Sequence, residues 1–264
     1  MPFTLAHPAA AVPLRKPLGR LGVLSALIVG SMAPDFVYYF PLGVSRASSH
    51  GPAGLFWFCV PAGLLAYGLF HSLMRPAIDF LLPPGLVTRL PKPTGGGGFR
   101  GRSIAAIVIS IWSGAVTHVL WDAFTHGNGY FVTRMAPLQA QMVNVSGYPV
   151  TVYKILQHGG TLIGLALLAL WAWRWYRTTE PSRDPGPEQT PAHVRAGMAL
   201  CLFAAGCVAG LVFGMAAARG EPGVRALQSF VVGGAIAATG TWAMCLTATG
   251  LWLRLARGRT RARE

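Results

Sequence analysis

The residues best suited to chemistry lie in one short segment, GAVTHVLWDAFTH at residues 114–126. It carries His118, Asp122 and His126 at intervals of four residues. Because an α-helix turns by about 100° per residue, the three side chains share one face within roughly 80° of arc. Two imidazoles and a carboxylate are nitrogen and oxygen donors of the kind that bind Zn²⁺ or a similar divalent ion. A carboxylate in an apolar helix is costly unless it is paired or binds something.

Further candidate ligands lie elsewhere in the chain. Asp35 follows GSMAP, His50 lies in the short segment SRASSHGP, and His158 opens a later apolar run. His7 lies near the start of the chain, and it can join the others only if residues 2–17 dip into the membrane or the first apolar stretch does not span. The predicted metal ligands are therefore His7, Asp35, His50, His118, Asp122, His126 and His158.

The composition predicts that these residues sit in a membrane protein. The chain is 53% hydrophobic and only 11% charged, where about a quarter charged is usual for a soluble domain. Its mean hydropathy is +0.47. We therefore expect an all-α, multi-span transmembrane helical bundle. The apolar stretches predict about six spans, at residues 20–41, 53–74, 103–124, 159–177, 194–218 and 226–253.

The net charge of +14 could suggest a nucleic-acid-binding protein, but the positions of the charges argue against it. Most of the 22 Lys and Arg residues fall on one side of the expected spans. The few on the other side are Arg46, Arg134, Lys154, Arg219 and Arg225. This positive-inside bias predicts that both termini are cytoplasmic and that the basic tail lies near anionic lipid. The expected partner is membrane lipid, with no nucleic acid.

The predicted organisation has three parts. Residues 1–177 form a core that carries the candidate metal site, and residues 178–193 form a polar, proline-rich linker. Residues 194–264 hold two further helices and the basic tail, and they show no chemistry of their own. Residues 130–157 form a long outer loop that could act as a lid or contact a substrate.

On the expected topology Asp35, His50, His118, Asp122, His126 and His158 all gather at the outer membrane face. This number of donors allows one metal ion, or a cluster whose bridging aspartates hold ions about 3.5–4 Å apart. Two other interpretations stay open. Single histidines are often no more than hydrogen-bonded interfacial residues, and a proton-coupled transporter also keeps buried Asp and His.

Several motifs together resemble a known family. The segments MPFTLAHPAA, LIVGSMAPDFVYYF, GAVTHVLWDAFTHG and VYKILQHGGTLIGL occur in this order within residues 1–175. They resemble an uncharacterised family of bacterial integral membrane proteins with a domain of unknown function, located in the inner membrane. That family is distantly similar to membrane proteins labelled predicted metal-dependent hydrolases.

The order of the candidate ligands is also similar to that of zinc-dependent phospholipases C. Those enzymes would require a glutamate four residues after His158, where this chain has Leu162. We therefore expect a hydrolase that acts on a phosphoester or lipid-linked substrate, with Asp122 or Asp35 bridging metals or positioning the attacking water. The alternative is a non-enzymatic membrane protein, either a proton-coupled transporter or a structural or assembly factor.

Overall fold

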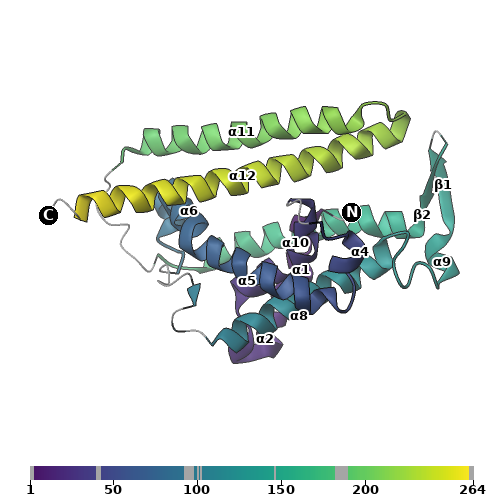
Figure 1. The fold of residues 1–264 in the computed structure, drawn as a ribbon, viewed down its shortest axis with the longest axis horizontal. Coiled ribbons are helices and arrows are strands. Elements are labelled where there is room, and N and C mark those ends of the chain that lie inside the picture. Colours follow the sequence, from purple (N-terminus) through teal and green to yellow (C-terminus); the bar gives the residue numbers. More distant parts are fainter. Residues whose placement is uncertain are drawn as a thin grey trace. The chain divides into compact units, whose positions relative to one another are not determined.

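The computed structural model describes residues 3–39, 43–91, 98–99, 101, 103–145, 147–181 and 190–261. Helices dominate this part of the chain, which confirms the predicted all-α, multi-span fold (Figure 1). Much of the predicted linker, residues 182–189, and the end of the basic tail, residues 262–264, lie outside the described residues.

The chain begins with short helical turns and continues with long helices. The first part, before the long helices, comprises η1 (Thr4–Ala6), α1 (Pro8–Ala11), η2 (Val12–Leu14), α2 (Arg15–Leu18), η3 (Gly19–Leu21), α3 (Leu24–Gly30), η4 (Ala33–Tyr38) and α4 (Arg46–Ser49). A helical stretch then runs through η5 (Leu55–Cys59), α5 (Val60–Leu69), η6 (Phe70–Met74) and α6 (Arg75–Leu81), and is followed by α7 (Pro84–Val87). The rest comprises α8 (Ile104–Thr125), α9 (Ala136–Gln139), β1 (Gln141–Val145), β2 (Tyr148–Thr151), α10 (Val152–Thr178), α11 (Ala192–Ala218) and α12 (Gly223–Arg261).

Five stretches are long and apolar enough to cross a membrane, one fewer than the sequence suggested. They are Leu55–Leu81, Ile104–Thr125, Val152–Thr178, Ala192–Ala218 and Gly223–Ala256. The chain is therefore a multi-pass membrane protein. The expectation that both termini are cytoplasmic stays a prediction.

The missing span is the first apolar stretch, residues 20–41. Its α-helix, α3, has only 7 residues and ends at Gly30, and the chain continues as the 3₁₀ turn η4. Pro34 explains the break, because proline has no N–H to donate to the carbonyl group four residues earlier, at Gly30, and its ring clashes with that carbonyl. The N-terminal turns before α3 lie close to the end of α8, where His7 Nε2 is 3.7 Å from Asp122 Oδ1.

The chain forms two compact units. The first comprises Met1–Tyr67 and Gly101–Trp173, and the second Gly68–Arg100 and Arg174–Glu264. The predicted division into a core at residues 1–177, a linker at 178–193 and two helices with the tail at 194–264 stays a prediction.

In the first unit α3 crosses α8 with the two backbones in close contact. A Cβ atom on Gly30 would collide with the backbone of Ile111, and one on Gly114 would collide with the carbonyl oxygen of Leu27. Glycine at both positions permits this approach. Ser110 of α8 reinforces the crossing, because its Oγ accepts a hydrogen bond of 2.9 Å from the N–H of Val23, just before α3. These contacts fix α3 along the face of α8 that carries His118 and Asp122.

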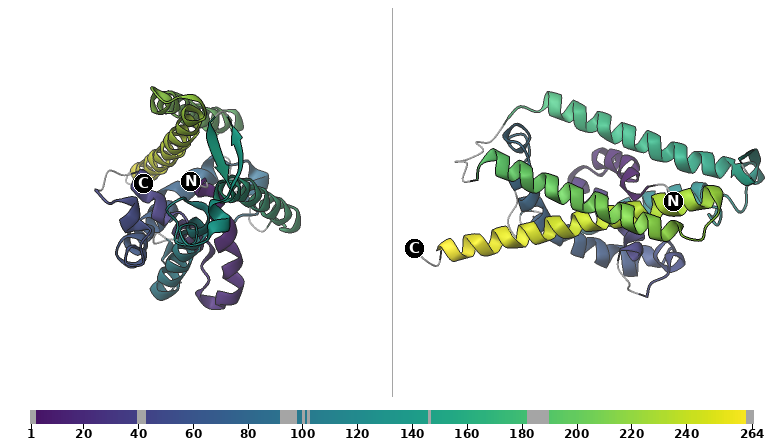
Figure 2. Two further views of the ribbon diagram at one scale, coloured as in Figure 1. Left: turned by 90° about the vertical axis from the view of Figure 1, so that its right-hand side faces the viewer. Right: turned by 90° about the horizontal axis from the view of Figure 1, so that it is seen from above.

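The predicted outer loop folds into ordered structure after α8. Strands β1 and β2 pair antiparallel as a hairpin (Figures 1 and 2). Gly147 has a positive φ of 82° in the turn, and its N–H donates to the side chain of Asn144. The sequence did not predict this hairpin, and a role of the loop as a lid or substrate contact stays a prediction.

In the second unit α11 and α12 form an antiparallel pair (Figures 1 and 2). Glycines lie at their contact: a Cβ on Gly210 would come within 3.1 Å of the Gly234 carbonyl oxygen. Trp242 Nε1 donates a hydrogen bond of 3.2 Å to the carbonyl oxygen of Phe203. Small residues that let helices approach closely are typical of packing in lipid.

We expect Gly114→Ala to destabilise the first unit. The added methyl group collides with backbone that cannot rotate away, and overpacking of this kind costs about 1–3 kcal/mol. Thermal unfolding of the detergent-solubilised protein measures the effect. Gly159→Ala in α10 is the matched control, because a Cβ there meets nothing within 4 Å. A Gly114→Ala variant as stable as the control would show that the crossing is loosely packed.

Candidate functional site

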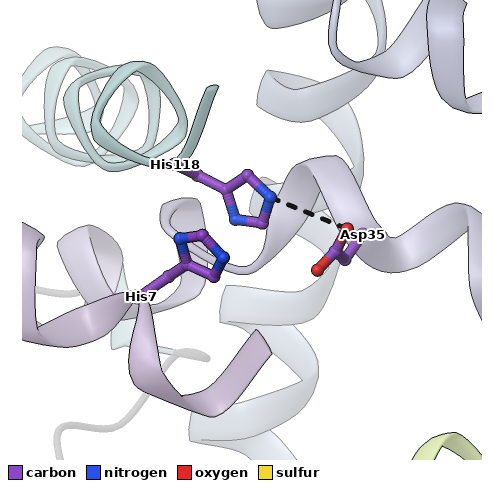
Figure 3. A group of neighbouring side chains, drawn as sticks. All are labelled: His7, Asp35 and His118. Atoms are coloured by element: carbon purple, nitrogen blue, oxygen red, sulfur yellow. Dashed lines mark ion pairs between the residues drawn. The ribbon is translucent and has the colours of Figure 1, made fainter. Parts of the chain in front are cut away.

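The structure brings six of the seven predicted ligands together. His118 and Asp122 lie on the buried face of α8, and His126 follows at its C-cap. His7 comes from the turn between η1 and α1, and Asp35 from η4. The sixth, His50, directly follows α4. Figure 3 shows His7, Asp35 and His118 facing one another from three separate segments of the chain. We call His7, Asp35, His50, His118, Asp122 and His126 the donor cluster.

Two imidazoles and two carboxylates form the centre of this cluster. His118 Nε2 lies 3.6 Å from Asp35 Oδ1 and 3.5 Å from Asp122 Oδ2. His50 Nε2 lies 3.5 Å from each of the same two oxygens. The four atoms therefore alternate, nitrogen and oxygen, around a closed ring with nearly equal edges.

The outer hydrogen bonds of the two imidazoles hold these nitrogens in place. His118 Nδ1 lies 2.7 Å from the carbonyl oxygen of Ser31, and His50 Nδ1 lies 3.1 Å from the carbonyl oxygen of Arg46. A carbonyl oxygen only accepts, so each Nδ1 donates. In a neutral ring, Nε2 then keeps its lone pair toward the centre of the cluster. A histidine that binds a metal through one nitrogen commonly donates from the other to a carbonyl group in this way.

Each carboxylate also has one oxygen held from outside. Thr4 Oγ1 donates a 2.6 Å hydrogen bond to Asp35 Oδ2. Arg46 donates to Asp122 Oδ2, also at 2.6 Å. Neither Thr4 nor Arg46 was among the predicted site residues. Arg46 lies four residues before His50, and Thr4 three residues before His7, so proximity in sequence was the only available signal.

The cluster concentrates buried polar atoms that have no partner. Among the described residues, these atoms accept or donate no hydrogen bond: His7 Nε2, Asp35 Oδ1, His50 Nε2, His118 Nε2, Asp122 Oδ1 and His126 Nε2. An unsatisfied buried polar group costs about 1–3 kcal/mol, and more when it is charged. Six such atoms in one cluster therefore require an explanation, and an unlocated ion is one that their chemistry fits.

His7 and His126 lie on the other side of Asp122. His7 Nε2 is 3.7 Å from Asp122 Oδ1, and its ring stacks on that of His118 with centroids 3.7 Å apart. His126 Nδ1 is 3.3 Å from the same oxygen. Burial and the neighbouring imidazole of His118 lower the pKa of His7 to about 3. Burial likewise lowers the pKa of His126 to about 4. Both rings are therefore neutral at pH 7 and can bind a cation.

The pKa values of Asp35 and His50 respond to each other. Burial alone would raise the pKa of Asp35, but the neighbouring His50, His118 and Thr4 together hold it below its usual value. Burial would lower the pKa of His50, but Asp122 and Asp35 raise it above its usual value. Asp35 is therefore a carboxylate at neutral pH.

Two groups within the cluster have a geometry that suits a metal ion. In His7, Asp35 and His118, and again in His50, His118 and Asp122, the potential ligand atoms all lie within 4.8 Å of one another. Both groups use His118. Because its Nδ1 is bound to Ser31, His118 offers only Nε2, so it cannot serve two ions at once.

The structure leaves His158 outside these groups. Its side chain is exposed on α10, whereas the neighbouring Gln157 is buried. The buried face of α10 continues through Thr161, which accepts a hydrogen bond from the N–H of Phe3, and Gly164. His158 is displaced from this face by about 100° of helical rotation, so the geometry does not support it as a ligand.

Comparison with known proteins places the chain in a family. A model of DUF4184, a domain of unknown function, matches residues 1–248. The chain belongs to the DUF4184 family. The match extends beyond the residue 175 at which the recognised motifs end and includes α11 and much of α12. No curated protein and no solved structure matches the chain, so the expected similarity of this DUF4184 protein to hydrolases and phospholipases C has no support.

In this DUF4184 protein we expect Thr4→Val to lower the free energy of unfolding. The substitution keeps the shape of the side chain but leaves the charged Asp35 Oδ2 without its donor, at a cost of about 1.5–3 kcal/mol. Thermal unfolding in detergent measures the loss. Thr4→Ser retains the hydroxyl group and serves as the control. If valine and serine proved equally stable, the Thr4 hydrogen bond would not be what holds Asp35.

Proposed function

We propose that the donor cluster binds one divalent metal ion, zinc by its donor set, and that the loaded site hydrolyses a phosphoester of a membrane lipid. The observation that carries this proposal is the closed ring of His50, His118, Asp35 and Asp122, with edges of 3.5–3.6 Å. Zn–N and Zn–O bonds of about 2.0–2.2 Å in a tetrahedron separate adjacent ligand atoms by about 3.4 Å. The ring is therefore close to the size that a tetrahedral zinc site requires.

The hydrogen bonds of the ring support the same interpretation. Three of its four atoms have no hydrogen-bond partner among the described residues, and the fourth, Asp122 Oδ2, is shared with Arg46. A carboxylate oxygen has two lone pairs and can accept from Arg46 while binding an ion. Two His and two Asp are also donors that suit Zn²⁺ better than Mg²⁺ or Ca²⁺, which prefer oxygen ligands alone.

The charge of the loaded site supports an anionic substrate. Two carboxylates, one guanidinium and one divalent ion sum to a single positive charge. Arg46 has 25% of its side chain exposed, whereas Asp122 beside it has 6%. Its guanidinium therefore reaches outward, where it can hold a phosphate oxygen through parallel hydrogen bonds.

A bound metal ion would supply an activated water and polarise a phosphoryl oxygen. The residues of the chain then have separate roles. Asp122 Oδ1, which faces His7 and His126, would accept a hydrogen bond from that water and so orient it. Asp35, held by Thr4, keeps its position and its negative charge.

The first test is the metal content of the purified full-length protein, measured by elemental mass spectrometry. We expect about one equivalent of zinc in the wild type and its loss in His118→Ala, which removes a ring nitrogen. The matched controls are His158→Ala, an exposed histidine of the same unit, and His193→Ala in the second unit. Both should keep the metal.

Stability provides a second readout of the same proposal. An ion that binds only the folded state at a thousand times its dissociation constant adds about 4 kcal/mol. Chelator should therefore lower the melting temperature of the wild type and leave His118→Ala unchanged. Zinc-free wild-type protein that is insensitive to chelator would reject the metal site and favour a structural or transport role.

We further expect Arg46→Met to weaken hydrolysis of phosphoesters while metal is retained. Loss of a charged contact to the substrate phosphate should raise KM by about tenfold or more, because such contacts are worth about 1.5–3 kcal/mol. Steady-state kinetics alongside metal analysis measures both effects. Arg134→Met, which removes a guanidinium that contacts Tyr130 instead, is the control. Unchanged KM in Arg46→Met would remove Arg46 from substrate binding.

A further inference from the structure

An apolar groove lies beside the donor cluster in the first unit. Its volume is about 140 Å³, and it is bounded by α1, by Trp121 of α8 and by α10. Among the described residues, His7 is the only ionisable one that lines it. The groove thus shares one side chain with the donor cluster.

The floor and the rim of the groove differ in exposure. His7 is 4% exposed and Gly164 is buried, and both lie at the floor. At the rim, Ile163 is 62% exposed and Leu167 is 54% exposed, both on a helix long and apolar enough to cross a membrane. Exposed apolar side chains of such a helix face lipid, so the groove opens toward the hydrocarbon of the bilayer.

Small residues keep the groove open. A Cβ atom on Gly160 would lie 2.6 Å from the ring of Trp121, and one on Gly164 would lie 3.0 Å from the carbonyl oxygen of Ala6. Larger side chains at these two positions would either fill the space or push its walls apart. Helix α10 therefore approaches the N-terminal turns closely while leaving a recess above His7.

The recess leads to an unpartnered polar atom. His7 Nε2 has no hydrogen-bond partner among the described residues, although its side chain is 98% buried. It lies 3.7 Å from Asp122 Oδ1. His7 therefore both lines the apolar groove and contacts the polar cluster.

We propose that the groove holds the first part of one hydrocarbon chain of a membrane lipid phosphate, whose headgroup then lies at the donor cluster. This inference rests on the proposed function and specifies its substrate. The rest of the chain lies in the bilayer. A lipid chain is the occupant that the lipid-facing rim favours, and a phosphate is the headgroup that the positive charge of the loaded site favours.

Native mass spectrometry of the full-length protein with added dioleoyl phosphatidic acid tests the groove. Ile163→Trp adds bulk at the rim, and Ala10→Phe adds bulk from α1 on the opposite wall. Leu162→Trp is the matched control, because Leu162 is the neighbouring residue on α10, is 71% exposed and does not line the groove. We expect bound phosphatidic acid to fall about fivefold to tenfold in the first two variants and to stay unchanged in the control. Equal retention in Ile163→Trp and Leu162→Trp would overturn the proposal.

Dioleoylglycerol, which has the same chains and no phosphate, tests the position of the headgroup. We expect the wild type to retain it less well than phosphatidic acid. Equal retention of the two lipids would mean that the phosphate does not reach the cluster, which would overturn the link between the groove and the site.

This readout does not depend on turnover, so the groove and the hydrolase can fail separately. If metal-loaded wild type hydrolyses neither phosphatidic acid nor bis(p-nitrophenyl) phosphate, the proposed function fails, and lipid retention alone decides the groove. If it hydrolyses both, we expect Ile163→Trp to lower the ratio of lipid to soluble-substrate kcat/KM, with the ratio unchanged in Leu162→Trp. An unchanged ratio in Ile163→Trp would exclude the groove from substrate binding.

Discussion

The structure depends on how two buried carboxylates are tolerated beside one another. Asp35 is fully buried and Asp122 is 4% exposed, and both face the same two imidazoles. Two negative charges removed from water at this separation are unfavourable unless cations or hydrogen bonds compensate them. Arg46 compensates one. His50 lies beside both carboxylates, with Nε2 3.5 Å from an oxygen of each, so a proton on His50 would compensate the other. A divalent ion would replace that proton, so the same geometry serves both states.

The close crossing of α3 and α8 holds the side chains around these carboxylates in fixed positions. The glycines at the crossing bring the backbone of α3 so close that the carbonyl oxygen of Ser31 reaches His118 at 2.7 Å. The chain then turns at Pro34, and Asp35 lies on the other side of the same imidazole. The Nδ1 atom of His118 is thus held by a backbone carbonyl group, and its Nε2 atom faces a carboxylate. A ring fixed at both ends loses little further freedom on binding an ion, which favours affinity.

The sequence predicted which residues of α8 share one face, whereas their role as a site stays a prediction. The spacing of His118 and Asp122 fixes their shared face through helix periodicity alone, and both lie on the buried face. Asp35 and His50 were expected as ligands because the order of the predicted apolar spans placed them at the same membrane face as His118. The sequence did not show that His158 is exposed on α10, because a position at the start of a helix says nothing of the face it occupies, and its role as a ligand stays a prediction. Arg46 could not be predicted, because its pairing with Asp122 spans 76 positions and depends on tertiary structure.

The broken first span explains why His7 belongs to the cluster. Hydropathy alone suggested that residues 20–41 cross the membrane, which would have left His7 on the opposite side from Asp122. A helix of 7 residues is about 10 Å long, far short of a hydrocarbon core of about 30 Å. The N-terminal turns instead pack against α10 and against the end of α8. A single proline after a short apolar helix thus determines which residues can meet, and it lets a chain segment that resembles a membrane span form the wall of a polar site.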